Sequence, residues 1–187
     1  MRPESDCSRC GLCTGRTKIV LPSGDSGSRV VFVGEAPGEA EDQSGMPFVG
    51  RSGKLLDKMM AEEGLDRTKV MITNTVKCRP PGNRDPTQEE MAACRPFLDF
   101  ELSDKDVVIG LGKSSCRDLL GFEGKMSQIA NTEQKIEVMG KSILFIPTYH
   151  PAACIYSRDA RDGLRRTIRT VVERYMGRVY GRIRIHD

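Results

Sequence analysis

The sequence lacks any long apolar run, and this absence limits the kinds of protein it can encode. No stretch of its 187 residues approaches the roughly 18 apolar residues that a membrane-spanning helix needs. The first ten residues, MRPESDCSRC, contain no hydrophobic signal region, and no internal repeat is present. We therefore expect a soluble, cytoplasmic protein without a membrane partner. The length predicts one domain over residues 1–187, monomeric by default, with a basic C-terminal tail at about 177–187.

A strong net charge is also missing. The formal charge is only +3 at pH 7, which is too small by itself to indicate a nucleic-acid partner. The basic residues are nevertheless placed unevenly, because arginine dominates the stretch 158–184. Two interpretations stay open: a basic face that binds a polyanion, or a solvated helix face laced with ion pairs.

Histidine is scarce and cysteine is plentiful, with two of the first and seven of the second. A reducing compartment disfavours structural disulfides, so metal binding or catalysis is the expected use of these thiols. Cys7 and Cys10, together with the distant Cys78 and Cys94, can supply four thiolates to tetrahedral zinc or to an iron–sulfur cluster. Spacing alone leaves the metal open, and Cys13 could replace either member of the first pair. The other two are expected to pack as small apolar side chains: Cys116 and Cys154.

Four short, β-branched apolar runs predict strands buried on both faces: 29–33, 70–73, 106–110 and 143–147. Helical patterns occupy about 53–63, 86–102 and 113–120, and a last amphipathic helix carries Leu164, Ile168, Val171, Val172 and Tyr175. Residues 21–28 and 121–133 are typical of loops. The alternation predicts an α/β fold with a parallel sheet covered by helices on both faces.

Ligands bind beyond the carboxyl ends of the strands in such a sheet, and polar motifs follow the predicted strands there. Glu35, in Gly-Glu-Ala-Pro-Gly, could orient water or face a developing cation, although the segment could also be an ordinary turn. Asn74 and Asn83 could read an amide-bearing base, or could cap a strand and occupy a turn. His150 could donate to an anion on a leaving group, or could be structural. A lone Phe48 is usually a core residue.

Five collinear motifs carry a resemblance that runs from Cys7 to about Pro151: C-S-R-C-G-L-C-T-G-R-T, G-E-A-P-G-E-A-E-D-Q-S-G-M-P-F-V-G-R-S-G, T-N-T-V-K-C-R-P-P-G-N-R-D-P, A-C-R-P-F-L and Y-H-P-A. In this set and order the sequence resembles the family 4 uracil-DNA glycosylases, the iron–sulfur branch of that superfamily. The resemblance implies a three-layer α/β/α fold around a central four-stranded parallel sheet. It also implies a [4Fe–4S] cluster on Cys7, Cys10, Cys78 and Cys94, with Cys13 spare, and uracil-containing DNA as the partner.

The resemblance further implies which residues act. Glu35 would assist water attack or stabilise the sugar cation, with Asn83 as the other polar residue at that place. His150 would donate to uracil O2 as negative charge builds on the departing base. The remaining positions would bind the base: Ala36 in the same motif as Glu35, Glu41 near C5 where bulk excludes thymine, Phe48 stacked on the ring and Asn74 on the N3–H and O4 edge.

The resemblance predicts a DNA repair enzyme that flips deoxyuridine out of DNA, hydrolyses its N-glycosidic bond and leaves an abasic site. The alternative is an iron–sulfur uracil-DNA binding or sensor protein without turnover. A relative that becomes covalently trapped on DNA through a histidine in an inserted basic loop is disfavoured, because residues 81–85 contain no insert. Residues after Ala152 diverge from the family's DNA-wedging loop, so Ile155 and Tyr156 are only weak wedge candidates.

Overall fold

The computed structural model describes residues 1–177 of the chain. The predicted basic tail beyond Gly177, and His186 with it, lie outside the described residues. Within the described part, no helix combines the length and the apolar character that crossing a membrane requires.

The sheet has six strands and is mixed, so the predicted four-stranded parallel sheet is not the whole of it. The strand order is β1-β3-β2-β4-β6-β5. The parallel neighbours are β2 (Val30–Gly34), β3 (Met71–Asn74), β4 (Val107–Leu111) and β6 (Lys141–Thr148). Two antiparallel strands close the edges: β1 (Ser23–Gly24) on β3 and β5 (Gln134–Val138) on β6.

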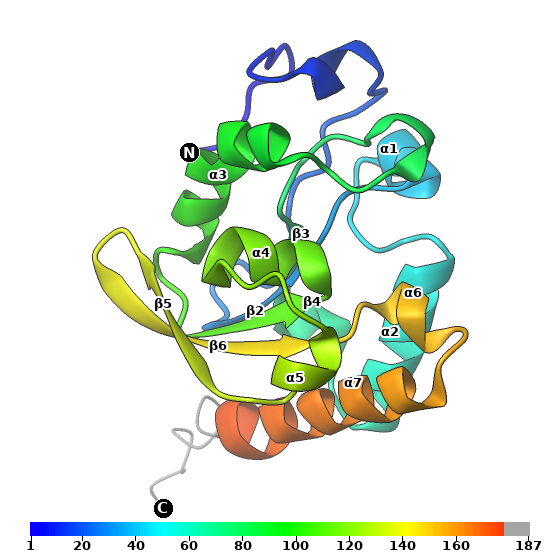
Figure 1. Cartoon of the computed structure of the whole chain (residues 1–187), viewed down its shortest axis with the longest axis vertical. Helices are drawn as coiled ribbons and strands as arrows, with labels where there is room; N and C mark the ends of the chain where they lie inside the picture. Colours follow the sequence, from blue (N-terminus) through cyan, green and yellow to red (C-terminus); the bar gives the residue numbers. More distant parts are fainter. Residues whose placement is uncertain (178–187) are drawn as a thin grey trace, which may run out of the picture.

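Helices cover both faces of the sheet, which confirms the predicted three-layer α/β/α arrangement (Figure 1). One face packs against α2 (Arg51–Glu62), α6 (Pro151–Cys154) and α7 (Arg158–Val171). The other packs against α3 (Gln88–Leu102), α4 (Lys113–Leu120) and α5 (Met126–Ile129). Because side chains alternate across a strand, Phe32 packs in the first core and its neighbours Val31 and Val33 pack in the second.

The elements that the sequence did not reveal lie in the segments predicted as loops or at the edges of the sheet. β1 lies within 21–28 and α5 within 121–133. β5 buries only alternate residues, so it has no continuous apolar run to mark it. The short α1 (Glu39–Ser44) and α6 are too brief for a periodic pattern to emerge. The chain is completed by 3₁₀ turns at η1 (Gly11–Thr14), η2 (Arg67–Lys69) and η3 (Pro81–Asn83) and a π-helical turn, η4 (Val172–Met176).

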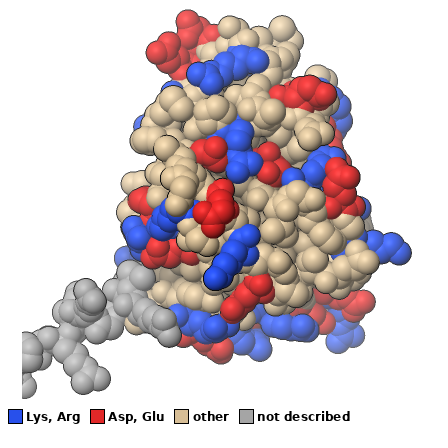
Figure 2. Space-filling view, turned by 60° about the vertical axis from the view of Figure 1, so that its left-hand side comes forward, with Lys and Arg blue, Asp and Glu red and all other residues tan. Residues whose placement is uncertain are grey.

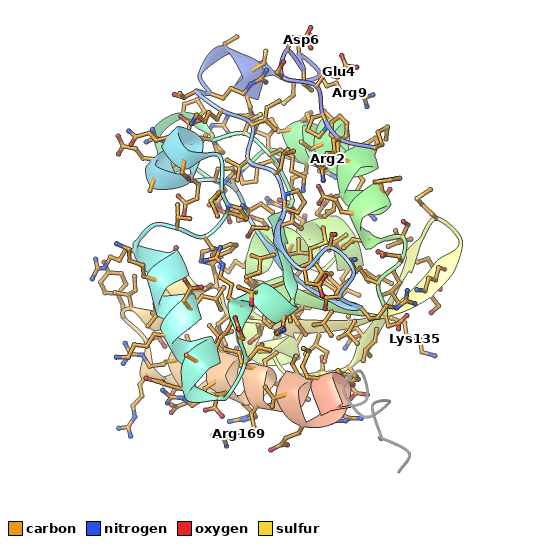
Figure 3. All side chains as sticks on the ribbon, turned by 180° about the vertical axis from the view of Figure 1, so that it is seen from behind. Arg2, Glu4, Asp6, Arg9, Lys135 and Arg169 are labelled. Atoms are coloured by element: carbon orange, nitrogen blue, oxygen red, sulfur yellow. The ribbon has the colours of Figure 1, made fainter. Side chains whose placement is uncertain are left out.

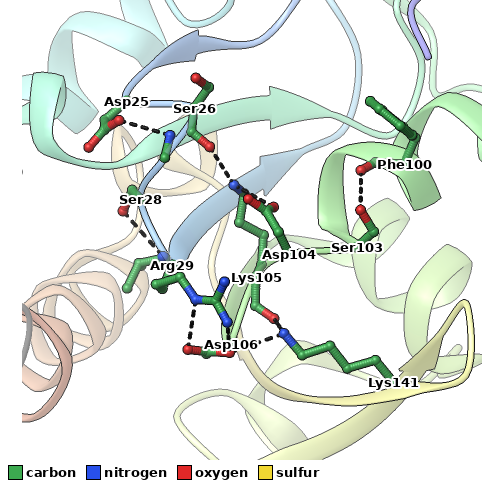
Figure 4. A network of polar contacts seen from close by, with 12 residues as sticks. Asp25, Ser26, Ser28, Arg29, Phe100, Ser103, Asp104, Lys105, Asp106 and Lys141 are labelled. Carbon is green, nitrogen blue, oxygen red and sulfur yellow. Dashed lines mark hydrogen bonds and ion pairs between the residues drawn. The ribbon is translucent and has the colours of Figure 1, made fainter.

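Charged contacts tie the amino ends of β2 and β4 together at the edge opposite their carboxyl ends (Figure 4). Arg29 donates to both carboxylate oxygens of Asp106, at 2.9 and 3.0 Å, and Lys141 donates to Asp106 at 3.1 Å. The buried Lys105 donates to the carbonyl of Ser26 at 2.7 Å. Arg29 and Asp106 are both largely exposed, so this pair stabilises the fold only slightly.

Two arginines of the arginine-rich stretch form ion pairs with another helix of the protein. Arg165 and Arg169 on α7 make ion pairs with Glu62 and Glu63 at the end of α2, with contacts of 2.8 and 2.9 Å. Arg169 lies at the opposite end of the molecule from the N-terminal segment (Figure 3). Figure 2 shows basic and acidic side chains interspersed over one face. For these two arginines the ion-pair interpretation is therefore confirmed.

A buried ion pair anchors the chain just after β3. Lys77 is only 1% exposed, and its Nζ donates to Glu101 Oε2, Thr73 Oγ1 and the Asn74 carbonyl, each at 2.7 Å. All three ammonium protons thus have acceptors, as a buried charge requires. The contact joins α3 to the carboxyl end of β3.

We expect Lys77→Met to lower the free energy of unfolding by about 3–5 kcal/mol, because it leaves Glu101 buried without its cation. The matched control is Lys141→Met, which breaks an exposed pair and should cost less than about 1 kcal/mol. Denaturant unfolding of both variants measures the difference. Equal losses would contradict this assignment.

Candidate active site

A cavity of about 690 Å³ opens at the carboxyl end of the sheet, and we call it the edge cavity. Every residue predicted for catalysis or base binding lines it: Glu35, Ala36, Glu41, Phe48, Asn74, Asn83 and His150. The structure therefore brings together residues from segments spread over more than a hundred positions of the chain.

The strand order explains why these segments meet. The chain leaves β2 for β3 on one side and later returns to β4 on the other, which makes the end of β2 a point where connections diverge. Such a point leaves a crevice beyond the strand ends. Gly34 ends β2 and Asn74 ends β3, and His150 lies two residues after Thr148, the last residue of β6.

Glu35 is held by a hydroxyl from the neighbouring connection. Ser114, in the first turn of α4, donates from Oγ to Glu35 Oε2 at 2.6 Å. Burial raises the pKa of Glu35, and the nearby charge of Asp85 acts in the same direction. The Ser114 hydrogen bond lowers that pKa, since it stabilises the ionised form. The carboxylate is thus partly withdrawn from water, and this strengthens its attraction to a positive charge placed beside it.

Asn74 presents an acceptor without a donor. The residue is 3% exposed, and its Oδ1 is buried with no hydrogen-bond partner. Its main chain is fixed, because Lys77 Nζ donates to its carbonyl. An unpaired buried amide oxygen is costly, so a ligand that brings an N–H group to this point gains a favourable contact.

Phe48 is a pocket wall in an unusual conformation. Its side chain is 4% exposed, and its φ of 53° lies in the left-handed region that residues with a β-carbon rarely adopt. The ring centroid lies 5.8 Å from that of His150, with 34° between the ring planes. The two rings leave an aromatic surface facing the edge cavity.

His150 begins α6 and is fixed by the backbone of that helix. Its Nδ1 accepts a hydrogen bond from the Ala152 N–H at 3.1 Å, so the proton of the neutral ring is on Nε2. Removal of the ring from bulk water lowers the pKa of His150 to about 4, although the charges of Glu41 and Asp85 act in the opposite direction. The ring is therefore a neutral donor through Nε2 at physiological pH.

The other two polar candidates have partners within the protein. Asn83, at φ 56°, accepts from Arg79 Nε through Oδ1 at 2.7 Å. Glu41 is 7% exposed and accepts the Gly50 N–H through Oε1 at 3.1 Å. Both side chains are oriented by these contacts, and Glu41 also closes the loop that carries Phe48.

Sequence reasoning missed Ser114, which lies three residues after the end of β4, in the first turn of α4. A signal was present, because Ser114 closely follows the predicted strand 106–110, and ligands were expected beyond the carboxyl ends of the strands. Of the two weak wedge candidates, Ile155 lines the edge cavity, and the neighbouring Tyr156 is 85% exposed.

The four predicted cysteine ligands line a second, small cavity between the N-terminal segment and α3: Cys7, Cys10, Cys78 and Cys94. Arg16 joins its walls, donating to the Cys7 carbonyl at 2.7 Å and to Cys78 Sγ at 3.6 Å. Burial raises the pKa of Cys78 to about 11, so it is a neutral thiol unless a metal replaces the proton. Cys13 is not among the lining residues. Cys116 and Cys154 are fully buried in the two cores, as predicted.

These thiols surround a space rather than converge on a point. Over residues 1–177, no three His, Cys, Asp or Glu side chains are grouped as they would be around a single metal ion. The donor set itself, four sulfurs from three segments around one cavity, fits a group that binds soft thiolate ligands.

The edge cavity combines features suited to breaking a bond between a planar polar ring and a carrier. It offers an aromatic wall, an unpaired amide oxygen, a neutral imidazole donor and a carboxylate. A donor and a carboxylate on opposite parts of a ligand would stabilise charge of opposite sign as the bond breaks.

The family model and the similar proteins all point to one superfamily. Residues 21–171 match the family model of the uracil DNA glycosylase superfamily. The chain is 41% identical over 174 residues to the type-4 uracil-DNA glycosylase of Sulfurisphaera tokodaii, covering 89% of this chain and 79% of that protein. It is also 41% identical over 171 residues to the type-4 uracil-DNA glycosylase of Thermotoga maritima, covering 90% and 86%. The type-5 uracil-DNA glycosylase of Thermus thermophilus is 32% identical over 118 residues, covering 54% and 53%.

We expect NMR to find His150 neutral at pH 7 with its proton on Nε2, and to titrate with a midpoint near 4. Since the unfolded value is about 6.5, the unfolded chain takes up this proton first. Stability contributed by the neutral ring is therefore complete above pH 6.5 and is lost as the pH falls towards 4. The only other histidine, His186, can be removed as His186→Gln to simplify the spectrum. A midpoint near 6.5, or a proton on Nδ1, would contradict this assignment.

Proposed function

Because the chain belongs to the uracil DNA glycosylase superfamily, we propose that it excises uracil from DNA as a type 4 enzyme, leaving an abasic site. It is a hydrolase of N-glycosidic bonds that acts in DNA repair. Uracil inside a duplex is out of reach of any side chain, so the deoxyuridine must be flipped into the edge cavity before the bond is cut.

The observation that carries the proposal is the unpaired Oδ1 of Asn74, a residue that lines the edge cavity. Uracil brings an N3–H donor beside an O4 acceptor, and an asparagine amide can accept from the first and donate to the second. Cytosine has no N3–H and carries an amino group at C4, so it cannot satisfy the same amide in this orientation. Glu41, fixed by Gly50, is the residue we assign to the C5 side, where thymine carries a methyl group.

The aromatic wall supports the same assignment. Phe48 offers a flat surface for the flipped ring, and base stacking on such a side chain stabilises binding by roughly 1–3 kcal/mol. Ala36, in the loop after β2, lines the cavity beside Glu35 and adds a small side chain that leaves room for the base. Since both contacts form before any bond breaks, they contribute to capture of the base and less to the rate of cleavage.

Charge separation during cleavage is matched by His150 and Glu35. As the bond to the sugar breaks, negative charge grows on uracil O2 and positive charge on the sugar. His150 Nε2–H donates to O2. Because the ring is neutral, it stabilises the growing anion through this hydrogen bond without having to give up its proton. Glu35, held by Ser114, faces the sugar and orients the attacking water or stabilises the cation. Asn83 assists there, with its Oδ1 held by Arg79.

We assign a [4Fe–4S] cluster to Cys7, Cys10, Cys78 and Cys94. Four thiols spread around one cavity favour a group of several irons, each taking one sulfur, over a zinc ion that needs all four within about 2.3 Å. When bound, the cluster supplies no redox step to hydrolysis; it joins the N-terminal segment to the loop after β3 and to α3. That loop begins directly after Asn74 and carries Asn83 into the edge cavity.

Gel-resolved strand cleavage tests the function. End-labelled oligonucleotides carrying U opposite G, U opposite A, single-stranded U and T opposite G are incubated with the protein and heated in alkali, which breaks the strand at abasic sites. We expect cleavage at uracil and none at thymine. His150→Ala, which removes the donor to O2, should lower the single-turnover rate roughly 10²–10³-fold. Failure of the unaltered protein to cleave any uracil substrate would reject the proposed activity.

Removal of the Ser114 hydroxyl should change the pH dependence of excision. Ser114→Ala takes away a hydrogen bond that lowers the pKa of Glu35, so that pKa rises further and less carboxylate is present on the acidic side. The rate should fall there by roughly tenfold and recover at high pH. Ser115→Ala is the matched control, because Ser115 is equally buried but donates to the Gly112 carbonyl. Superimposable pH profiles for both variants would show that Ser114 does not act through Glu35.

The cluster assignment predicts a brown protein that contains iron and acid-labile sulfide. Cys7→Ala and Cys94→Ala should lose the colour and melt at a lower temperature, because a long loop is then released. Cys13→Ala, at a residue outside the cysteine cavity, should keep both. Stoichiometric zinc without iron in anaerobically purified protein would reject the assignment.

A further inference from the structure

The backbone of Phe48 is in a conformation that needs an outside cause. A φ of 53° brings the β-carbon of an ordinary residue close to its own carbonyl, and Phe48 has neither the freedom of glycine nor the polar side chain of asparagine. Such a residue persists only where surrounding groups fix it. The contacts that do so come from outside the edge cavity.

Arg67, in the η2 turn between α2 and β3, holds the two carbonyls that flank this bend. Its Nη1 donates to the Phe48 carbonyl at 2.6 Å, and its Nη2 donates to the Pro47 carbonyl. Asp57 on α2 accepts from Nη1 at 2.9 and 3.1 Å, so the guanidinium is itself oriented. Arg67 is 19% exposed and Asp57 is 42% exposed, so the guanidinium lies under the loop while its carboxylate partner is partly in contact with solvent.

The first turn of α2 packs directly against the main chain at this bend. A β-carbon added at Gly53 would lie 2.0 Å from the Phe48 carbonyl oxygen, so the loop backbone rests directly on the helix. Gly53 and Asp57 are four residues apart and share a face of α2. The α2 surface at Gly53, the Asp57 carboxylate and the Arg67 guanidinium thus together fix the main chain at Phe48.

We propose that Arg67 is a positioning residue that acts through Phe48: it fixes the aromatic wall in place before the base arrives. The inference rests on the proposed function, since the wall matters only if a planar base stacks on it. A preformed wall spares the complex the cost of ordering the loop on binding. Arg67 does not line the edge cavity, so its effect on the base passes through Phe48.

The test is a double-mutant cycle with Arg67→Lys and Phe48→Ala. Lysine keeps the charge but lacks the planar fork that reaches two carbonyls and a carboxylate together. We expect Arg67→Lys to raise the inhibition constant of free uracil roughly tenfold, in line with loss of a stacking surface, and to affect the saturated single-turnover rate less. In the Phe48→Ala background the same substitution should change neither quantity further.

Arg29→Lys is the control, because Arg29 also donates to both oxygens of one carboxylate, that of Asp106, and lies at the far edge of the sheet. It should leave uracil inhibition unchanged. If Arg67→Lys does not fold, Asp57→Asn replaces it, since it frees the guanidinium while leaving the carbonyl contacts available. Losses that multiply in the double variant, or an Arg67→Lys effect no larger than that of Arg29→Lys, would overturn the inference.

A second readout does not depend on excision. The ring of Phe48 lies near that of His150, so its ring current affects the His150 ring-proton signals. Those signals should shift in Arg67→Lys and stay in place in Arg29→Lys. Unmoved signals in Arg67→Lys would overturn the inference even if excision were normal. An unaltered protein without excision activity would reject the proposed function and leave this measurement able to decide the role of Arg67.

Discussion

At Gly34, the last residue of β2, an added β-carbon would lie 2.3 Å from Phe48 Cζ and 2.5 Å from Asn74 Oδ1. The missing side chain is what allows an aromatic ring and an amide from two separate segments to meet over the end of one strand. The β2–β3 pairing then continues beyond the strands, because Thr75 donates to the carbonyls of Gly34 and Glu35. Asn74 and the Glu35 carboxylate are therefore held on two neighbouring segments that are hydrogen-bonded to each other.

Around that point the site separates two electrostatic tasks. His150 is kept neutral by burial, which suits a donor that faces a growing anion without itself carrying charge. Glu35 is pushed towards its neutral form by burial and returned towards the carboxylate by Ser114. Burial thus moves the pKa of both groups: the shift suits His150 as a neutral donor, whereas for Glu35 the Ser114 hydrogen bond opposes the shift and favours the carboxylate.

The sequence was informative where local pattern decides structure. The four central strands are buried on both faces and read as continuous apolar runs, whereas β5 buries only alternate residues and was missed. Polar residues that directly follow strands were expected to meet, and they line one cavity. Ser114 and Arg67 act through contacts made 79 and 19 positions away, which no local pattern encodes. The arginine-rich stretch was ambiguous because ion pairing on α7 depends on where the end of α2 lies.

The end of β2 shapes the uracil pocket because Gly34 has no side chain, and adding one methyl group there tests this. Gly34→Ala should keep the melting temperature close to that of the unaltered protein and lower single-turnover excision of uracil roughly 10²-fold, since small displacements of positioning groups have effects of that size. Gly15→Ala, where an added β-carbon meets nothing within 4 Å, is the control and should excise normally. Excision by Gly34→Ala at the unaltered rate would contradict the account.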